Sequence, residues 1–220
     1  MSFLFTFPPN AAFGKVLPKG KIYEHASPSA SVRELFIREV DKITWSYKLS
    51  PKTINLPARG EVQEIQVFTI VLKAKSLSQA VLTTIDKAIP SPIFFVLSFE
   101  EQVRYVATYK RLSEADKSKW VVSSYFESDW MAVDTESRHL PLALDMGSLY
   151  HQLLKHLIPL QAREGESMEA LVARCERLKK LEREVERTES RLNSEKQFNR
   201  KVEINAELRK FKLELEEMAR

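Results

Sequence analysis

Histidine and cysteine are the side chains of this sequence best suited to bind a metal or act as nucleophiles, and the chain has four histidines and one cysteine. His25 and His139 are isolated, and His151 and His156 are five residues apart on one predicted helix, where ligands three or four apart would share a face. No His-Glu-x-x-His motif or second cysteine accompanies them, so we predict no metal site and no bound cofactor. Cys175 lies on an apolar helical stripe, where a free thiol behaves as a small hydrophobic group.

Glycine-rich phosphate-binding loops are also missing from the sequence. It contains no G-x-x-x-x-G-K-[ST] or G-x-G-x-x-G motif, and no G-x-S-x-G nucleophile motif. The five glycines are scattered, so they cannot form a cradle for phosphates. This pattern argues against an NTPase, a dinucleotide enzyme or a serine hydrolase.

One acidic pattern bears a loose likeness to nuclease sites. Restriction-type endonucleases place an acid on one strand and an acid-x-Lys pair on the next, which together hold Mg²⁺ and orient water. Here Glu64 and Gln66 begin a predicted strand, Lys73 ends it, and Asp41 precedes the strand before. Because the lysine is missing from the pair, a divergent metal-dependent nuclease that uses these four residues is only an alternative. Glu64 and Gln66 are otherwise solvent-facing residues at the start of a strand.

The charge balance permits a polyanionic partner without requiring one. Lysine and arginine total 34 against 30 acidic residues, which gives a net charge of +4. Phosphate contacts need only positive, flexible side chains, so basic clusters are candidate nucleic-acid-binding residues. Three clusters qualify: Lys15, Lys19 and Lys21; Lys48 beside Trp45 and Tyr47; and Lys196, Arg200 and Lys201. Aromatic residues of the predicted strands could stack on bases, although ordinary burial in the core is the more frequent role.

These residues need a scaffold, and the patterning predicts an α+β domain over residues 1–164. Residues 1–28 carry several turn signals and are predicted to form an irregular arm. Helical or alternating apolar spacing then predicts a mostly antiparallel mixed sheet with flanking helices. The predicted helices cover 31–42, 76–89 and 146–159, and the predicted strands cover 43–50, 61–73, 91–99, 103–111 and 120–128.

The composition changes sharply after residue 165. All ten prolines and all five glycines precede residue 166, and the remainder is dense in charge. One apolar stripe runs from Leu171 to Leu192, and a second, out of phase with the first, runs from Ile204 to Met218. A turn near 193–199 would let two antiparallel helices face each other, so we predict a coiled-coil hairpin over 165–220. A single helix that pairs with a second copy of the chain is the alternative.

Several segments spread along nearly the whole chain resemble one bacterial family. They are "YEH", "ITWSYKLSPKTINL", "VQEIQVFTIVLK", "IDKAIPSPIFFVL" and "EKQFNRKVEINAEL". In their residues and in their order along the chain, these segments are similar to the family catalogued as domain of unknown function 4391. Members of that family are often encoded beside superfamily 2 helicases and DNA methyltransferases of restriction and phage-defence loci. The resemblance implies an accessory protein of a DNA-handling complex and supplies no catalytic residue.

From these observations we expect a non-enzymatic adaptor of a bacterial restriction-modification or phage-defence complex. Its partner would be a helicase or a methyltransferase, with DNA as a possible second ligand. The other alternative, besides the nuclease, is a homo-oligomeric scaffold built on the C-terminal helices. No signal peptide and no apolar run of membrane-spanning length is seen, so we expect a cytoplasmic protein without membrane contact.

Overall fold

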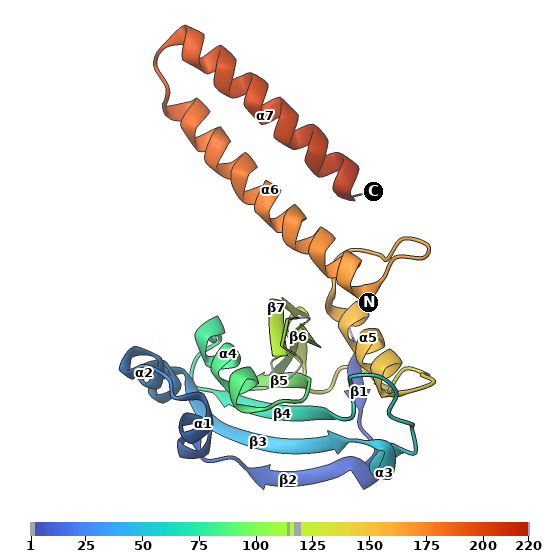
Figure 1. Ribbon diagram of the computed structural model, residues 1–220. Coiled ribbons are helices and arrows are strands. Elements are labelled where there is room, and N and C mark those ends of the chain that lie inside the picture. Colours follow the sequence, from blue (N-terminus) through green and yellow to red (C-terminus); the bar gives the residue numbers. More distant parts are fainter. Residues whose placement is uncertain (1–2, 114, 117–119, 220) are drawn as a thin grey trace. The chain divides into compact units, whose positions relative to one another are not determined.

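The computed structural model describes residues 3–113, 115, 116 and 120–219 (Figure 1). It divides into two compact units, Met1–Leu157 and Ile158–Arg220, which we call the body and the hairpin unit. The composition shift in the sequence predicts a boundary after residue 164. The structural division falls after helix α5 (Met146–Leu157), so the segment before residue 165 belongs to the hairpin unit.

The body is an α+β fold, as the sequence predicts. Its strands are β1 (Leu4–Thr6), β2 (Ala12–Val16), β3 (Val40–Leu49), β4 (Ile65–Leu72), β5 (Ile93–Phe99), β6 (Gln102–Leu112), β7 (Trp120–Glu127), β8 (Met131–Ala132) and β9 (Ser137–His139). Its helices are η1 (Pro9–Ala11), α1 (Lys19–Ala26), α2 (Ala30–Glu39), α3 (Pro51–Ile54), α4 (Gln79–Ala88) and α5. The predicted order of long elements, from the helix before β3 to α5, is confirmed.

The main sheet is mixed and mostly antiparallel, with the strand order β2-β3-β4-β5-β6-β7. Within this order only β4 and β5 run parallel, joined by a crossover through α4. Strand β8 extends the sheet against β6, and β1 pairs with β9 in a separate two-stranded sheet. Because β4 lies between two strands and is covered on both faces, its sequence "IQVFTIVL" is almost continuously apolar.

Alternate residues of the central strands build two cores on opposite faces of the sheet. Phe95 and Phe68 belong to the core that also contains α4, with Val81 among its members. Phe94 points to the other face, where its ring lies 5.9 Å from Phe5 of β1. Helices α1, α2 and α4 therefore share one face of the sheet (Figure 1), while β1 lies on the other.

The prediction of an irregular arm over residues 1–28 is wrong. This segment forms β1, η1, β2 and α1, and Ile22 of α1 is buried in the core. Strand β1 pairs with β9 at the far end of the body, and β2 pairs with β3 as the sheet edge. Local turn signals do not reveal partners that are distant in the chain, so the segment appears irregular in sequence.

Two predicted boundaries also moved. The helix predicted over 31–42 is α2, which Ser29 caps by accepting a hydrogen bond from the amide of Val32. The chain extends into β3 immediately after Glu39. The strand predicted from residue 61 begins only at Ile65, because Gly60 has a φ of 70° and the chain turns there.

The hairpin unit consists of α6 (Met168–Ser194) and α7 (Phe198–Ala219), joined by a short turn. As the residue number rises along α6, the number of its ion-pair partner on α7 falls, as antiparallel helices require. Three ion pairs show this order: Arg177–Glu214, Glu189–Lys212 and Arg191–Glu207. The second predicted stripe lies on the seam, with Ile204 and Leu208 buried. The predicted antiparallel coiled-coil hairpin is confirmed, with its turn inside 193–199.

Candidate nucleic-acid interface

The base of the hairpin is closed by one buried arginine. Ser167 caps α6 by accepting a hydrogen bond from the Ala170 amide at 3.1 Å. Two turns after Ser167, Arg174 is 8% exposed and donates to both Glu166 carboxylate oxygens, at 2.8 and 2.9 Å. It also donates to the carbonyl oxygens of Gln161 and Met218. The Arg174 clamp thus joins the segment before α6 to the last turn of α7.

The Glu166 carboxylate is held ionised by this arrangement. Hydrogen bonds from the Arg174 side chain and the Arg163 amide lower its pKa to about 2. A planar guanidinium that meets both carboxylate oxygens gives the most directional type of ion pair. Arg174 is therefore committed to structure, and its charge is compensated within the hairpin unit.

A basic groove of about 870 Å³ runs along the hairpin beside this clamp. Its lining consists of Arg163, Arg174, Arg177, Ala206, Arg209, Lys210, Leu213, Glu214, Glu217 and Met218. Five cations face two carboxylates, and Arg177 is already paired with Glu214. Arg209 and Lys210 have no ion-pair partner among the described residues. These two side chains are therefore available to contact an anion from outside.

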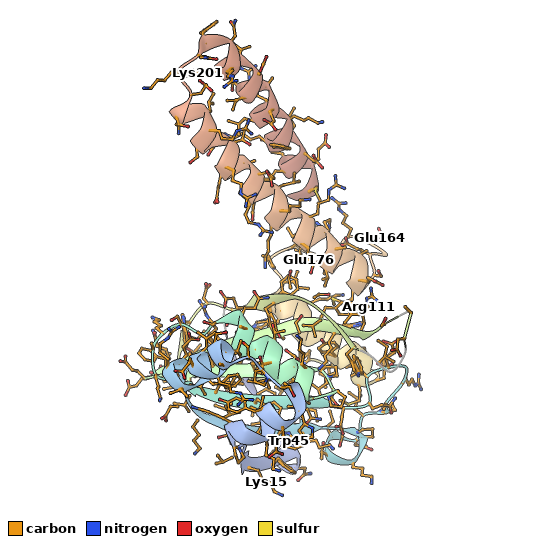
Figure 2. The ribbon with its side chains drawn as sticks, turned by 60° about the vertical axis from the view of Figure 1, so that its left-hand side comes forward. Lys15, Trp45, Arg111, Glu164, Glu176 and Lys201 are labelled. Atoms are coloured by element: carbon orange, nitrogen blue, oxygen red, sulfur yellow. The ribbon has the colours of Figure 1, made fainter. Side chains whose placement is uncertain are left out.

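The predicted cluster at the tip is less strongly basic than the groove. Lys201 projects from the tip in Figure 2, and Lys196 is exposed there. Arg200 lines a second hollow of about 320 Å³ together with Glu195 and Glu203. The Glu195 carboxylate accepts the amides of Lys196 and Gln197, and these bonds lower its pKa. The tip therefore balances its cations with nearby acids.

Three of the four predicted basic residues of the body are engaged within the fold. The ammonium of Lys19 donates to the carbonyls of Phe36 and Val40 at the C-terminal end of α2, and burial lowers its pKa. Lys21 pairs with Glu24 at 2.8 Å, and Lys48 pairs with Glu64 at 2.7 Å. Lys15 is exposed on β2, with its ammonium 4.9 Å from the Phe13 ring.

The aromatic residues near Lys48 do not share one surface. Figure 2 shows Trp45 near Lys15, which is its register partner across β2 and β3. The Trp45 ring stacks on Phe68, at 5.8 Å, on the face that α4 covers. Tyr47 stacks on Phe7, at 4.8 Å, on the opposite face. The structure therefore does not bring Trp45 and Tyr47 together as a base-stacking platform.

The four residues of the nuclease alternative lie at two ends of the sheet. Glu64 and Gln66 are at the start of β4, whereas Lys73 follows its end, about 30 Å from Glu64 and about 23 Å from Gln66 at the rise of an extended strand. Asp41 lies beside the Lys73 end, because Val40 pairs with Leu72. Lys73 donates to the carbonyl of Ile37. The expected common site of these residues is therefore not formed.

Within the described part of the chain, no three His, Cys, Asp or Glu side chains are placed to hold a metal ion. His156 instead packs against Phe3 and Phe5, with ring centroids 4.5 and 5.1 Å away. Burial lowers its pKa. Cys175 is buried in α6, and burial raises the pKa of its thiol.

Sequence reasoning missed a buried ionic cluster in the body. Lys110 of β6 and Asp86 of α4 are each 2% exposed, with Nζ and Oδ1 3.5 Å apart. The Lys110 ammonium also donates to the carbonyls of Asp86, Ile89 and Ser91, where α4 ends. It thereby caps the negative end of the helix dipole. The only sequence signal is an acid on the apolar face of a predicted helix.

Tyrosines complete this cluster. The Tyr125 hydroxyl donates to Asp86 Oδ2 at 2.5 Å. Even so, burial raises the pKa of Asp86 to about 6, above its ordinary value of 3.8. The Tyr150 hydroxyl of α5 accepts from the Lys110 amide and donates to the Thr108 carbonyl, where β6 changes register. The cluster is a structural device that joins α4, β6, β7 and α5.

These features define the class of protein: an α+β body that carries a helical hairpin with a basic groove. No helix in the described residues is long and apolar enough to cross a membrane. The chain belongs to the family described as domain of unknown function (DUF4391), whose model matches residues 5–215. No curated protein and no solved structure matches it.

Proposed function

We propose that the chain is a non-enzymatic accessory protein whose hairpin binds the DNA backbone within a bacterial restriction-modification or phage-defence complex. In this proposal the body docks on a cytoplasmic helicase or methyltransferase, as the family resemblance implies. The observation that carries it is the basic groove, where Arg209 and Lys210 have no acidic partner among the described residues. Cations placed on a rigid helix suit contacts to phosphate oxygens, which need no sequence-specific geometry.

The test is DNA binding measured by fluorescence anisotropy over a series of salt concentrations. Each lost phosphate contact lowers the slope of log K against log salt by about 0.9 for duplex DNA. The double variant Arg209→Glu, Lys210→Glu should therefore weaken binding and reduce the slope by about 2. A control with the same change in charge is Lys42→Glu, Lys87→Glu, which alters two exposed residues of the body. Equal losses in both double variants would contradict a specific groove.

The tip residues provide a third arm of the same experiment. Replacement of Lys196, Arg200 and Lys201 by glutamate removes the cluster that the sequence predicts. If DNA contacts only the basic groove, the tip variant should bind DNA almost as tightly as the unaltered chain. Loss of binding confined to the tip variant would move the site to the turn of the hairpin.

One further observation favours a protein partner for the same helix. Phe198, Val202 and Leu213 are 77%, 55% and 63% exposed and lie within about 60° of one another around α7, at 100° per residue. Arg209 lies on the same side of the helix between Val202 and Leu213, so a partner helix that covers these apolar side chains would compete with DNA for the groove. Sedimentation analysis of Val202→Glu, Leu213→Glu tests whether that helix comes from another copy of the chain. If the unaltered protein is a monomer, the helix that covers these side chains would have to come from a different protein.

A further inference from the structure

Phe198 is an aromatic residue at the tip of the hairpin, and the backbone contacts of the groove do not use it. It is the first residue of α7, directly after the turn, and its side chain is 77% exposed. The residues around it in the turn, 196, 197 and 199–201, are all polar and exposed. The ring is therefore displayed to solvent, where a flat ligand can reach it.

The turn that presents Phe198 is ordered by hydrogen bonds. Glu195 ends α6, and its carboxylate accepts the amides of Lys196 and Gln197 at 2.7 and 2.8 Å. The Lys201 amide then donates to the Gln197 carbonyl at 3.0 Å, which closes the first turn of α7. Because the backbone on both sides of the ring is already fixed, a ligand gains contact with Phe198 without the cost of ordering a loop.

The charges around the ring suit a polyanion. Lys196 and Lys201 lie two and three residues from Phe198, and neither has an ion-pair partner among the described residues. The nearest acid, Glu195, is engaged by the two backbone amides of the turn. The tip is less basic than the groove, but its two cations flank an exposed ring. Surfaces that bind unpaired bases combine aromatic rings and positive side chains in this way.

Phe198 also shares one face of α7 with a cation of the groove. Arg209 lies eleven residues further along the helix. At about 100° per residue, the two side chains point within about 20° of each other, and at about 1.5 Å per residue they are about 16 Å apart. Since duplex DNA rises about 3.4 Å per base pair, this separation corresponds to about five base pairs. One DNA molecule can therefore contact Arg209 through a phosphate and Phe198 through a base.

We propose that Phe198 stacks on an unpaired base, so that the hairpin recognises DNA in which a duplex adjoins an unpaired nucleotide. This inference rests on the proposed binding of the DNA backbone by the groove and adds what the tip contacts. An unpaired base offers a flat face to an aromatic ring, and no base pair has to be opened to reach it. A base inside an intact duplex is covered on both faces by its neighbours, so an intact duplex contacts the groove alone.

The test compares two duplexes of the same sequence, one intact and one with a single unpaired adenine near its middle, by fluorescence anisotropy. The unaltered full chain should bind the second duplex about tenfold more tightly, the effect of one base–aromatic stack. Phe198→Leu keeps an apolar side chain without the flat ring and should lose most of this preference, whereas Phe198→Trp should keep it. Val202→Ala, at a 55% exposed residue one turn later, is the matched control and should also keep it. None of the three variants should change the affinity for the intact duplex.

The salt dependence separates stacking from additional phosphate contacts. Stacking releases no counterions, so the slope of log K against log salt should be the same for both duplexes. The spacing along α7 has its own test, in which neutral methylphosphonate linkages are placed about five positions from the unpaired base. These linkages should weaken binding by the unaltered chain and cause no further loss in Arg209→Ala, because that variant already lacks the contact.

Three results would overturn the proposal. The first is equal affinity for the two duplexes, which would leave the groove as the DNA site and remove the role of Phe198. The second is a preference that Phe198→Leu retains in full, since the DNA with the unpaired base would then be favoured for its flexibility. The third is self-association of the unaltered chain that Phe198→Glu abolishes without any change in the preference, which would assign the ring to a helix of a second copy. Failure of the groove is observed separately, as an unchanged affinity of Arg209→Glu, Lys210→Glu for the intact duplex.

Discussion

Replacement of Lys110 by methionine should strongly destabilise the folded body. Methionine matches the length of the lysine stem but carries no charge and no donor. The change leaves the Asp86 carboxylate buried without its cation, and it leaves three carbonyls at the end of α4 without their common donor. The defect is therefore electrostatic, with only a minor change in packing.

The expected loss in free energy of unfolding is at least about 4 kcal/mol. Removal of one partner from a buried ion pair costs about 3–5 kcal/mol, because the other charge stays buried and uncompensated. Each orphaned carbonyl adds about 1–3 kcal/mol, less whatever a water molecule recovers. Since the total stability of a domain is about 5–15 kcal/mol, the variant should be close to unfolding.

Urea unfolding followed by tryptophan fluorescence measures this loss in the full chain. Trp45, Trp120 and Trp130 all belong to the body, so the signal reports its unfolding alone. Lys87→Met, an exposed lysine on α4, is the matched control and should change stability by less than about 0.5 kcal/mol.

The pH dependence gives a sharper criterion. The pKa of Asp86 is raised to about 6, so the folded body binds a proton more tightly than the unfolded chain between pH 4 and 6. Stability from this group is therefore present at low pH and falls as pH rises through 6. The deficit of Lys110→Met should be largest at pH 7.5 and smaller at pH 5, and Asp86→Asn in the same chain should reduce it at pH 7.5. A loss equal to that of Lys87→Met, or one independent of pH, would refute the reasoning.

Three other outcomes follow from the described contacts. Tyr150→Phe removes the hydroxyl that bridges the Lys110 amide and the Thr108 carbonyl, so the body should lose about 1–3 kcal/mol in the same urea assay. Leu208→Ala on the hairpin seam should lower its melting temperature, whereas Leu213→Ala, 63% exposed on the same helix, should not. Arg174 lowers the pKa of Glu166 to about 2, so the clamp stabilises the hairpin above the unfolded pKa of about 4.5 and loses this contribution as pH falls toward 2. Circular dichroism should show the resulting acid transition. The Glu166→Gln variant should not show it.

Elements with strong local periodicity could be predicted from the sequence. Helix α4 and strand β4 were both expected, and the phase change between the stripes through Leu181 and Leu208 located the turn of the hairpin. In each case the apolar residues of one segment define its own buried face. Strand β1 was missed because its partner, β9, is more than 130 residues away along the chain.

Site residues were harder to predict, because their roles depend on distant backbone atoms. Lys19 looked like a free cation, but it caps the end of α2 through Phe36 and Val40. Lys110 gave no signal, since its acceptors belong to α4 and the residues after it. By contrast, Arg209 and Lys210 stood out only when the structure showed which basic residues lack a partner.

The Arg174 clamp has a mechanical consequence for the hairpin. Arg174 of α6 binds both the Glu166 carboxylate, in the segment before α6, and the Met218 carbonyl in the last turn of α7, so the two helices are joined at the base of the hairpin. At the opposite end, the turn after Ser194 is exposed and Phe198 is uncovered. The two helices should therefore separate first at the tip and last at the base. Amide protons near Arg200 should exchange with solvent before those near Leu215, a polarity that leaves the groove intact while the tip opens.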